Sequence, residues 1–365
     1  MGVDPHTGAV VEIPAGVAAG RGRLHIHGIT NAHPINSRER TKCSSPAASS
    51  RLFFSQEPSI GRRCGPYGSI RSKGQGPYDR IRIAVSDQAH SSIANTLRII
   101  GAESLVIPTE SQRLTGPNLR AALEAEPHPA DVIAVVATTS TTSAGIIDHL
   151  AGIAATAREF GLWLHVDGAY GGAGLLAPSV RSRYQGIEHA DSLVIDPHKW
   201  LYAPLDCAAL LYRDPALAKA AHTQHASYLD VLQDDDDTAW NPSGSAHHLS
   251  RRARGLPLWF SLAVHGTRVY TNAIEVALTL ARDTADLIRG TPHLEPIREP
   301  DLSVVLFRRT GWTADDFHRW SSRLLADQTG FVAPTGRQGE AIARLAFLNP
   351  TTTIATVRDI LHTML

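Results

Sequence analysis

From Ile81 onward, short apolar runs alternate with longer stretches of helical periodicity, and this alternation constrains the fold more than any other feature. The clearest pair is DVIAVVATT, followed by IDHLAGIAATAREFG, which is amphipathic and closes at Gly161. Apolar runs of this kind, separated by helices, are typical of parallel strands that are buried on both faces. The sequence therefore predicts an α/β fold with a mostly parallel sheet, covered by helices and wound with right-handed crossovers.

The chain divides into three parts by composition and pattern. Residues 1–80 are rich in Gly, Pro, Ser and Arg and show almost no periodicity, so we expect an irregular, atypical N-terminal segment. Residues 81–285 are expected to form a large α/β domain, which ends within a long helical stretch over 256–290. Residues 286–365 are expected to form a small C-terminal α/β domain, in which one helix begins at the cap Thr313.

The composition argues against several classes of function. The formal net charge is zero, so neither nucleic acid nor an anionic membrane is indicated as a partner. No apolar stretch is long enough to span a bilayer and no secretion signal stands at the N-terminus, so we expect a cytoplasmic protein. No metal site is expected, because the three cysteines lack ligand spacing and the acidic run 234–237 is interpreted as a solvated loop.

Charged side chains follow two of the predicted strands directly. Asp167 ends the apolar run LWLHVD, and Lys199 stands in DPHKW, just after the run SLVI. Open α/β sheets bind ligands at the carboxyl ends of their strands, so both side chains are expected at one site. A partly desolvated lysine can form a Schiff base, and an aspartate nearby can keep a pyridine nitrogen protonated. The pair predicts a site for pyridoxal 5'-phosphate, which acts as an electron sink.

These motifs also carry a resemblance to a known family. HVDGAYGG, followed about thirty residues later by DPHKW, resembles the group II pyridoxal-phosphate-dependent decarboxylases, which include the aromatic-L-amino-acid and glutamate decarboxylases. The similarity extends from about Ile81 to the C-terminus and includes SDQAHSSIANTLRIIG, ATTSTTSAGIID and ARLAFLNPTTT. It implies a fold-type I architecture, a homodimer with its active site at the interface, and decarboxylation of an L-amino acid to an amine and CO2.

The resemblance assigns catalytic roles to three residues of this chain. It implies that Lys199 forms the Schiff base with the cofactor and that Asp167 pairs with the ring nitrogen. His90, in SDQAHSS, is implied to stack on the ring and to approach the substrate carboxylate, although a histidine that merely begins a helix is the alternative. Ala169 is implied to lie under the ring.

Three more cofactor contacts follow from the same resemblance. Thr141 or Thr142, together with His198, are implied to lie near the phosphate and the ring substituents. The two threonines could instead form a simple turn after their strand. Arg344, in the small domain, could meet either a substrate carboxylate or a structural one.

Two features of the family are missing from the sequence. A Gly/Ser/Thr-rich turn that leads into a helix and binds the phosphate is absent upstream of His90, where CGPYGSIRSKGQGPYDR stands instead. Residues 1–80 are unlike the family, and a shifted reading frame, a truncation and a divergent extension all stay open. The loop that carries a proton-donating tyrosine in some members has Tyr228 early and Trp240 later, so no donor is assigned.

Two alternatives to an amino-acid decarboxylase stay open on the sequence. Another fold-type I lyase, or an aldehyde-forming decarboxylase, would use the same lysine and aspartate. A catalytically impaired remnant that acts only as a dimerising scaffold is the alternative from a different class, and the missing phosphate turn favours it.

Overall fold

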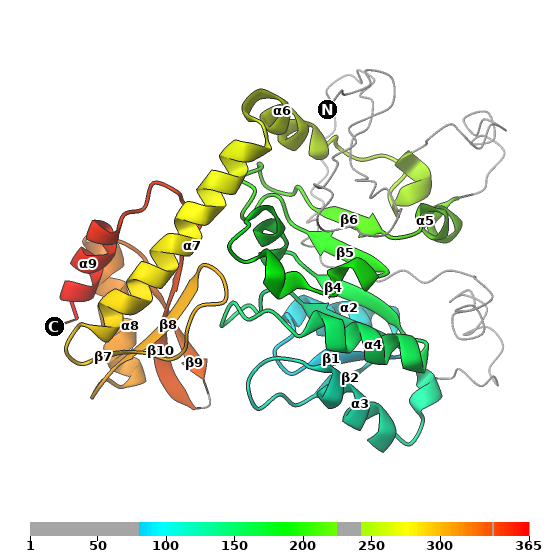
Figure 1. Cartoon of the computed structure of the whole chain (residues 1–365), viewed down its shortest axis with the longest axis horizontal. Coiled ribbons are helices and arrows are strands. Elements are labelled where there is room, and N and C mark those ends of the chain that lie inside the picture. Colours follow the sequence, from blue (N-terminus) through cyan, green and yellow to red (C-terminus); the bar gives the residue numbers. More distant parts are fainter. Residues whose placement is uncertain (1–79, 225–241, 338, 365) are drawn as a thin grey trace.

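The computed structural model describes residues 80–224, 242–337 and 339–364, and Figure 1 shows them as two lobes side by side. We call them the large lobe, built on a six-stranded sheet, and the small lobe, built on a four-stranded sheet. The expected irregular segment lies outside the described residues apart from Arg80, as do Tyr228, Trp240 and the acidic run 234–237.

The large sheet confirms the predicted α/β class. Its strand order is β2-β1-β3-β4-β5-β6, and every neighbouring pair is parallel except β5 with β6. The antiparallel edge strand is consistent with a sheet expected to be mostly parallel. The strands are β1 (Arg82–Ser86), β2 (Glu103–Ile107), β3 (Val132–Thr138), β4 (Trp163–Asp167), β5 (Ser192–Ile195) and β6 (Ala209–Tyr212).

Helices cover both faces of this sheet, because β1, β3 and β4 carry buried apolar side chains on both faces. One face packs against α3 (Gly116–Ala125) and α4 (Leu150–Phe160). The other packs against α2 (Ser91–Ile100) and α5 (Pro215–His222). The predicted end of α4 at Gly161 is present, with φ 65°, a left-handed conformation that glycine adopts without strain.

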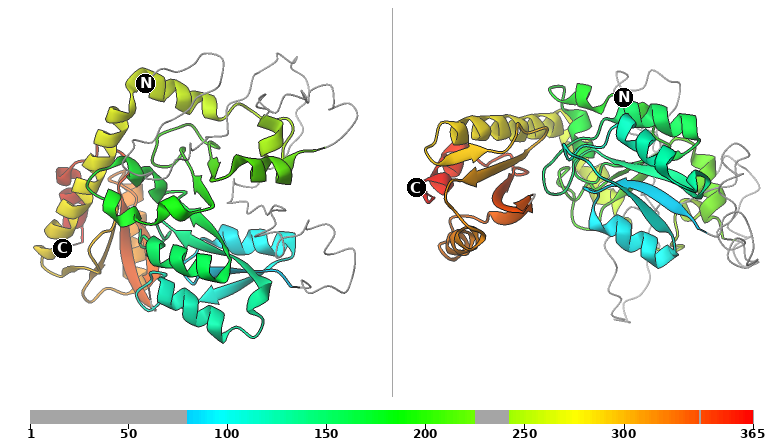
Figure 2. Two further views of the ribbon diagram at one scale, coloured as in Figure 1. Left: turned by 45° about the vertical axis from the view of Figure 1, so that its right-hand side comes forward. Right: turned by 90° about the horizontal axis from the view of Figure 1, so that it is seen from below.

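The helical stretch expected over 256–290 is two helices, not one. α6 (Gly255–His265) and α7 (Thr267–Arg289) are separated by Gly266, whose φ of 71° and ψ of 160° are not helical. The apolar pattern runs through this position, so only the glycine signals the break. Figure 2 shows α7 extending from the large lobe along the small one, and it contacts β7, β8 and α9 there.

The small lobe has an antiparallel sheet in the order β7-β8-β10-β9, against which α7 and α8 pack. The predicted cap at Thr313 is present: its hydroxyl accepts from the Asp316 N–H, and the Asp316 carboxylate accepts from the Thr313 N–H. The elements are β7 (Leu294–Pro296), β8 (Val304–Arg309), α8 (Ala314–Ala326), β9 (Ala333–Arg337), β10 (Glu340–Ala346) and α9 (Ile354–His362). Among the described helices, none is long and apolar enough to cross a membrane.

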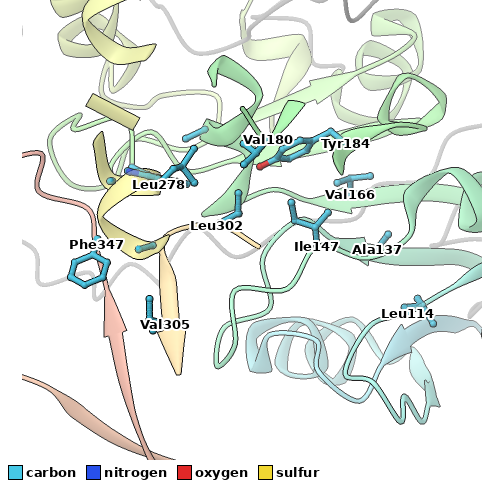
Figure 3. Packing of buried hydrophobic residues seen from close by; sticks show 14 of the residues in the cluster. Leu114, Ala137, Ile147, Val166, Val180, Tyr184, Leu278, Leu302, Val305 and Phe347 are labelled. Atoms are coloured by element: carbon cyan, nitrogen blue, oxygen red, sulfur yellow. The ribbon is translucent and has the colours of Figure 1, made fainter. Parts of the chain in front are cut away.

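The two lobes share a continuous apolar core. Figure 3 shows part of it, with Leu302 between Ile147 of the large lobe and Val305 of the small one. Next to this core, the buried carboxylate of Asp301 accepts hydrogen bonds from Arg113 at 2.6 Å and from Arg183 at 3.0 Å. It also accepts from the Ile147 N–H at 3.1 Å, so one small-lobe side chain binds three groups of the large lobe.

Replacing Asp301 with alanine is therefore expected to destabilise the joint between the lobes. Removing one partner from a buried charge cluster commonly costs 3–5 kcal/mol, and the partly exposed arginines here reduce that to about 3 kcal/mol. Urea unfolding followed by fluorescence measures the loss. Glu299→Ala is the control, because that carboxylate is 74% exposed and its loss should leave the unfolding midpoint unchanged. Equal midpoints for the two variants would contradict the role of Asp301.

Candidate active site

The carboxyl ends of β1, β3, β4 and β5 meet at one edge of the large sheet and surround a cavity of about 360 Å³. Arg344 lines this cavity, and so do all seven catalytic and cofactor-binding candidates from the sequence: His90, Thr141, Thr142, Asp167, Ala169, His198 and Lys199. The sheet edge thus brings them together as expected, whereas the individual roles implied by the resemblance stay predictions.

The turn after β5 holds Lys199 at the cavity. Its Nζ lies 3.0 Å from Asp196 Oδ2, and its N–H donates to the Asp196 carbonyl at 2.9 Å. The next residue, Trp200, is fully buried, so the turn is anchored in the core beneath the lysine. The lysine side chain itself is 38% exposed and accessible to a ligand in the cavity.

Asp167 is the last residue of β4 and only 7% exposed. Burial raises the pKa of this carboxyl, while the hydrogen bond from the Ala169 N–H and the charge of Lys199 act in the opposite direction. Among the described residues, no cationic side chain forms an ion pair with it. A protonated pyridine nitrogen would supply the missing positive partner, so the residue fits the proposed cofactor.

The histidine and the threonines are held by their own local structure. His90 is the N-cap of α2, and its Nδ1 accepts from the Ser92 N–H at 3.1 Å. Thr141 is buried, and its hydroxyl accepts from the Ile146 N–H at 3.2 Å, closing the loop after β3. Thr142 is exposed, so it is the better placed of the two threonines to reach a ligand. The structure therefore shows structural roles for His90 and Thr141, and their contacts with a cofactor stay predictions.

The cavity also has residues that the sequence reading missed. Asp196 begins DPHKW and is 6% exposed, and its Oδ1 has no hydrogen-bond partner among the described residues. Tyr170 ends the motif HVDGAY and also lines the cavity. Both stood inside motifs already noted, so their positions, though not their contacts, were open to prediction.

A phosphate could be held by several donors at this edge. The hydroxyls of Ser92, Ser140 and Thr142 line the cavity together with the His198 ring. The Nδ1 of His198 lies 2.6 Å from the Cys207 carbonyl, which fixes the orientation of the imidazole. Within the described part of the chain, no group of three His, Cys, Asp or Glu residues is placed to hold a metal ion. The lining residues thus fit an anionic organic cofactor.

Comparisons with known proteins identify the family of this chain. The chain matches the model of the pyridoxal-dependent decarboxylase conserved domain over residues 70–310. It is 30% identical over 292 residues to tryptophan decarboxylase 1 of Oryza sativa subsp. japonica, covering 75% of this chain and 57% of that protein. It is 32% identical over 233 residues to L-2,4-diaminobutyrate decarboxylase of Acinetobacter baumannii, covering 62% and 46%. The chain thus spans about half the length of these curated relatives.

Solved structures also have a fold similar to that of this chain. Oryza sativa TDC with PLP and tryptamine superposes with a TM-score of 0.73 at 26% identity, over 84% of this chain and 66% of that one. Mouse CSAD in apo form gives a TM-score of 0.72 at 23% identity, over 83% and 68%, a likeness of fold alone. Since the family model matches more than half of the residues, the predicted family is confirmed: the chain belongs to the pyridoxal-dependent decarboxylases, whose cofactor is pyridoxal 5'-phosphate.

Proposed function

We propose that this protein decarboxylates an L-amino acid to the corresponding amine and CO2. The observation that carries the proposal is that Lys199, Asp167 and Arg344 line one cavity. They offer an amine for the cofactor aldehyde, a carboxylate for the ring nitrogen and a guanidinium for the substrate carboxylate. The relatives named above act on tryptophan and on L-2,4-diaminobutyrate, which supports an amino-acid substrate without selecting its side chain.

When bound, pyridoxal 5'-phosphate supplies the electron sink for the electron pair of the broken Cα–carboxylate bond. Lys199 would hold the cofactor through its amine and would give way there to the amino group of a substrate. Asp167 would keep a proton on the ring nitrogen, which would strengthen this electron sink electrostatically. Ala169 and Val194 add apolar surface to the cavity wall and help to exclude water from these charges.

Arg344 is the best candidate to bind the substrate carboxylate. It lies on β10, paired in register with Leu306 of β8, and its side chain lines the cavity from the small lobe. Among the described residues, no carboxylate forms an ion pair with it, and its buried Nε has no hydrogen-bond partner. Burial lowers the pKa of this guanidinium. An incoming carboxylate would neutralise the charge of the guanidinium and accept from its N–H groups at the cavity.

Replacing Arg344 with glutamine should raise KM for the substrate by about 10- to 100-fold, because a charge-assisted hydrogen bond is worth about 1.5–3 kcal/mol. Steady-state kinetics measures KM and kcat separately. Arg308→Gln is the matched control, since that arginine of the same lobe is exposed and pairs with Glu295 and Glu340. A KM for Arg344→Gln equal to that of the control would show that another group binds the carboxylate.

A homodimer and a cytoplasmic location belong to the same proposal. α6 has no buried residue, and Leu256, Phe260 and Val264 expose 45%, 59% and 65% of their surface. An apolar face of this kind is typical of a protein interface, and a second copy of the chain would cover it. A buried free thiol at Cys207 supports a reducing compartment.

The function is tested by incubating the purified full chain with pyridoxal 5'-phosphate and a panel of L-amino acids. The panel includes tryptophan, tyrosine and 2,4-diaminobutyrate, and the readouts are released CO2 and the product identified by mass spectrometry. Equal amounts of amine and CO2 support the proposal. An aldehyde in place of the amine overturns it in favour of an aldehyde-forming decarboxylase. Bound cofactor without CO2 from any amino acid contradicts catalysis altogether.

A further inference from the structure

Tyr170 connects the lysine turn to the rest of the cavity. It follows Ala169 in the loop after β4, and its side chain lines the cavity. Its ring stacks on the ring of Trp200, with centroids 5.0 Å apart and planes within 7° of parallel. Because Trp200 is fully buried and directly follows Lys199, one end of Tyr170 is fixed relative to the lysine.

The other end of Tyr170 reaches the small lobe. Its hydroxyl is hydrogen-bonded to the hydroxyl of Ser303, a fully buried residue that precedes β8. The Ser303 carbonyl in turn accepts from the Phe347 N–H at 2.9 Å, just beyond the end of β10. Burial raises the pKa of the phenol to about 12, so the hydroxyl stays neutral and available for this bond. One side chain thus ties the lysine turn to the strand that carries Arg344.

Tyr170 also lies close to Arg344 itself. Its ring packs against the apolar cluster that includes Leu306 and Ile342. Leu306 is the register partner of Arg344, and Ile342 stands two residues before it on the same face of β10. The phenol and the guanidinium line the same cavity and interact electrostatically. Tyr170 and Arg344 therefore lie against the same part of the small sheet.

We propose that Tyr170 is a positioning residue that sets the distance between Arg344 and Lys199. This inference rests on the proposed function, in which Arg344 binds the substrate carboxylate. The two groups come from different lobes, while the amino group and carboxylate of an α-amino acid are joined through a single carbon. A guanidinium at the wrong distance from Lys199 binds the carboxylate less well, so a rigid spacer that preorganises the two groups has a clear use.

The test compares the hydroxyls of Tyr170 and Tyr202, each of which forms a hydrogen bond between the lobes. Tyr170→Phe and Ser303→Ala each remove the bond described above. Tyr202→Phe is the matched control, because the Tyr202 hydroxyl donates to the Leu348 carbonyl at 3.0 Å but does not line the cavity. The readouts on the full chain loaded with cofactor are KM and kcat. The dissociation constants of 3-phenylpropanoate and of its neutral amide are measured by calorimetry on the same samples.

Tyr170→Phe and Ser303→Ala should each weaken 3-phenylpropanoate binding and raise KM by about fivefold, the effect of one hydrogen bond, with kcat within twofold of the parent. Binding of the amide should not change, and the double variant should be no worse than either single one. Tyr202→Phe should match the parent. Equal weakening in Tyr202→Phe would mean a general loosening of the joint and would overturn the inference.

An Arg344→Gln sample separates this inference from the proposed function. If it binds the acid as well as the parent does, the proposed role of Arg344 is wrong and the role of Tyr170 is wrong with it. If Arg344→Gln loses the acid while Tyr170→Phe retains parental affinity, only the positioning role is overturned.

Discussion

Replacing Lys199 with alanine should abolish turnover and covalent attachment of the cofactor while leaving the fold intact. The side chain is 38% exposed, and its polar contact is the ion pair with Asp196, so its removal opens no cavity in the core. Pyridoxal 5'-phosphate can still enter the cavity by its phosphate and ring, but no amine remains at this turn to bind the aldehyde. The variant should therefore bind the cofactor reversibly and release it on gel filtration.

Borohydride reduction followed by peptide mapping tests the assignment directly. The chain has four lysines, so the labelled peptide identifies its residue without ambiguity: Lys42, Lys73, Lys199 and Lys219. The parent should be labelled at Lys199, and the alanine variant should carry no stable label. Lys219→Ala is the control, since that lysine lies on α5 and does not line the cavity. A label that persists in Lys199→Ala would refute the assignment.

The residues at the edge of the large sheet could be predicted from the sequence because the same local pattern recurs at each strand. Strands buried on both faces give continuous apolar runs, and the polar residue after each run marks the carboxyl end. This logic placed Asp167 and Lys199 at one site, where the structure has them. Gly161 ends its helix as predicted, whereas the apolar pattern continues through Gly266 and does not predict the break there.

The contacts between the lobes could not be predicted in the same way. Tyr170 meets Ser303 across 133 positions of sequence, and Arg113 meets Asp301 across 188. Neither pair has a local signature, since each depends on how the small sheet packs against the large lobe. The alternatives left open for Arg344 had the same origin: only tertiary placement distinguishes a guanidinium at a cavity from one in a surface ion pair. Motifs therefore identified the site, and packing supplied its geometry.

Asp148 is a residue that looks catalytic from its motif and its pKa but has a structural role. It stands in ATTSTTSAGIID, a segment that resembles the family, and burial raises its pKa to about 7. Such a carboxyl would suit general acid–base chemistry. It does not line the cavity, however, and accepts 2.7 Å hydrogen bonds from the N–H groups of Leu114 and Thr138. Asp148 thus ties its own loop to the end of β3 and to the loop before α3, so a perturbed pKa alone does not mark a site.

Asp167→Asn is expected to lower kcat by about two orders of magnitude or more, the usual cost of removing a preorganised charge from a reacting centre. Asparagine has the same shape, and its side-chain oxygen can still accept from the Ala169 N–H, which donates to Asp167 at 3.0 Å. The change thus removes the negative charge with little change in packing. Without that charge, a proton on the ring nitrogen is no longer stabilised, and the cofactor withdraws electrons less strongly.

The same variant should leave the cofactor-free protein at least as stable as the parent. Burial raises the pKa of Asp167, which means that the fold disfavours its charged form, and a neutral amide avoids that cost. Urea unfolding of the cofactor-free chain measures this, and stopped-flow kinetics of the loaded chain measures the chemical step. Asp191→Asn is the control: this carboxylate accepts from the Leu164 N–H at 2.8 Å and does not line the cavity. Parental kcat in Asp167→Asn, or an equal loss in both variants, would show that Asp167 does not support the ring nitrogen.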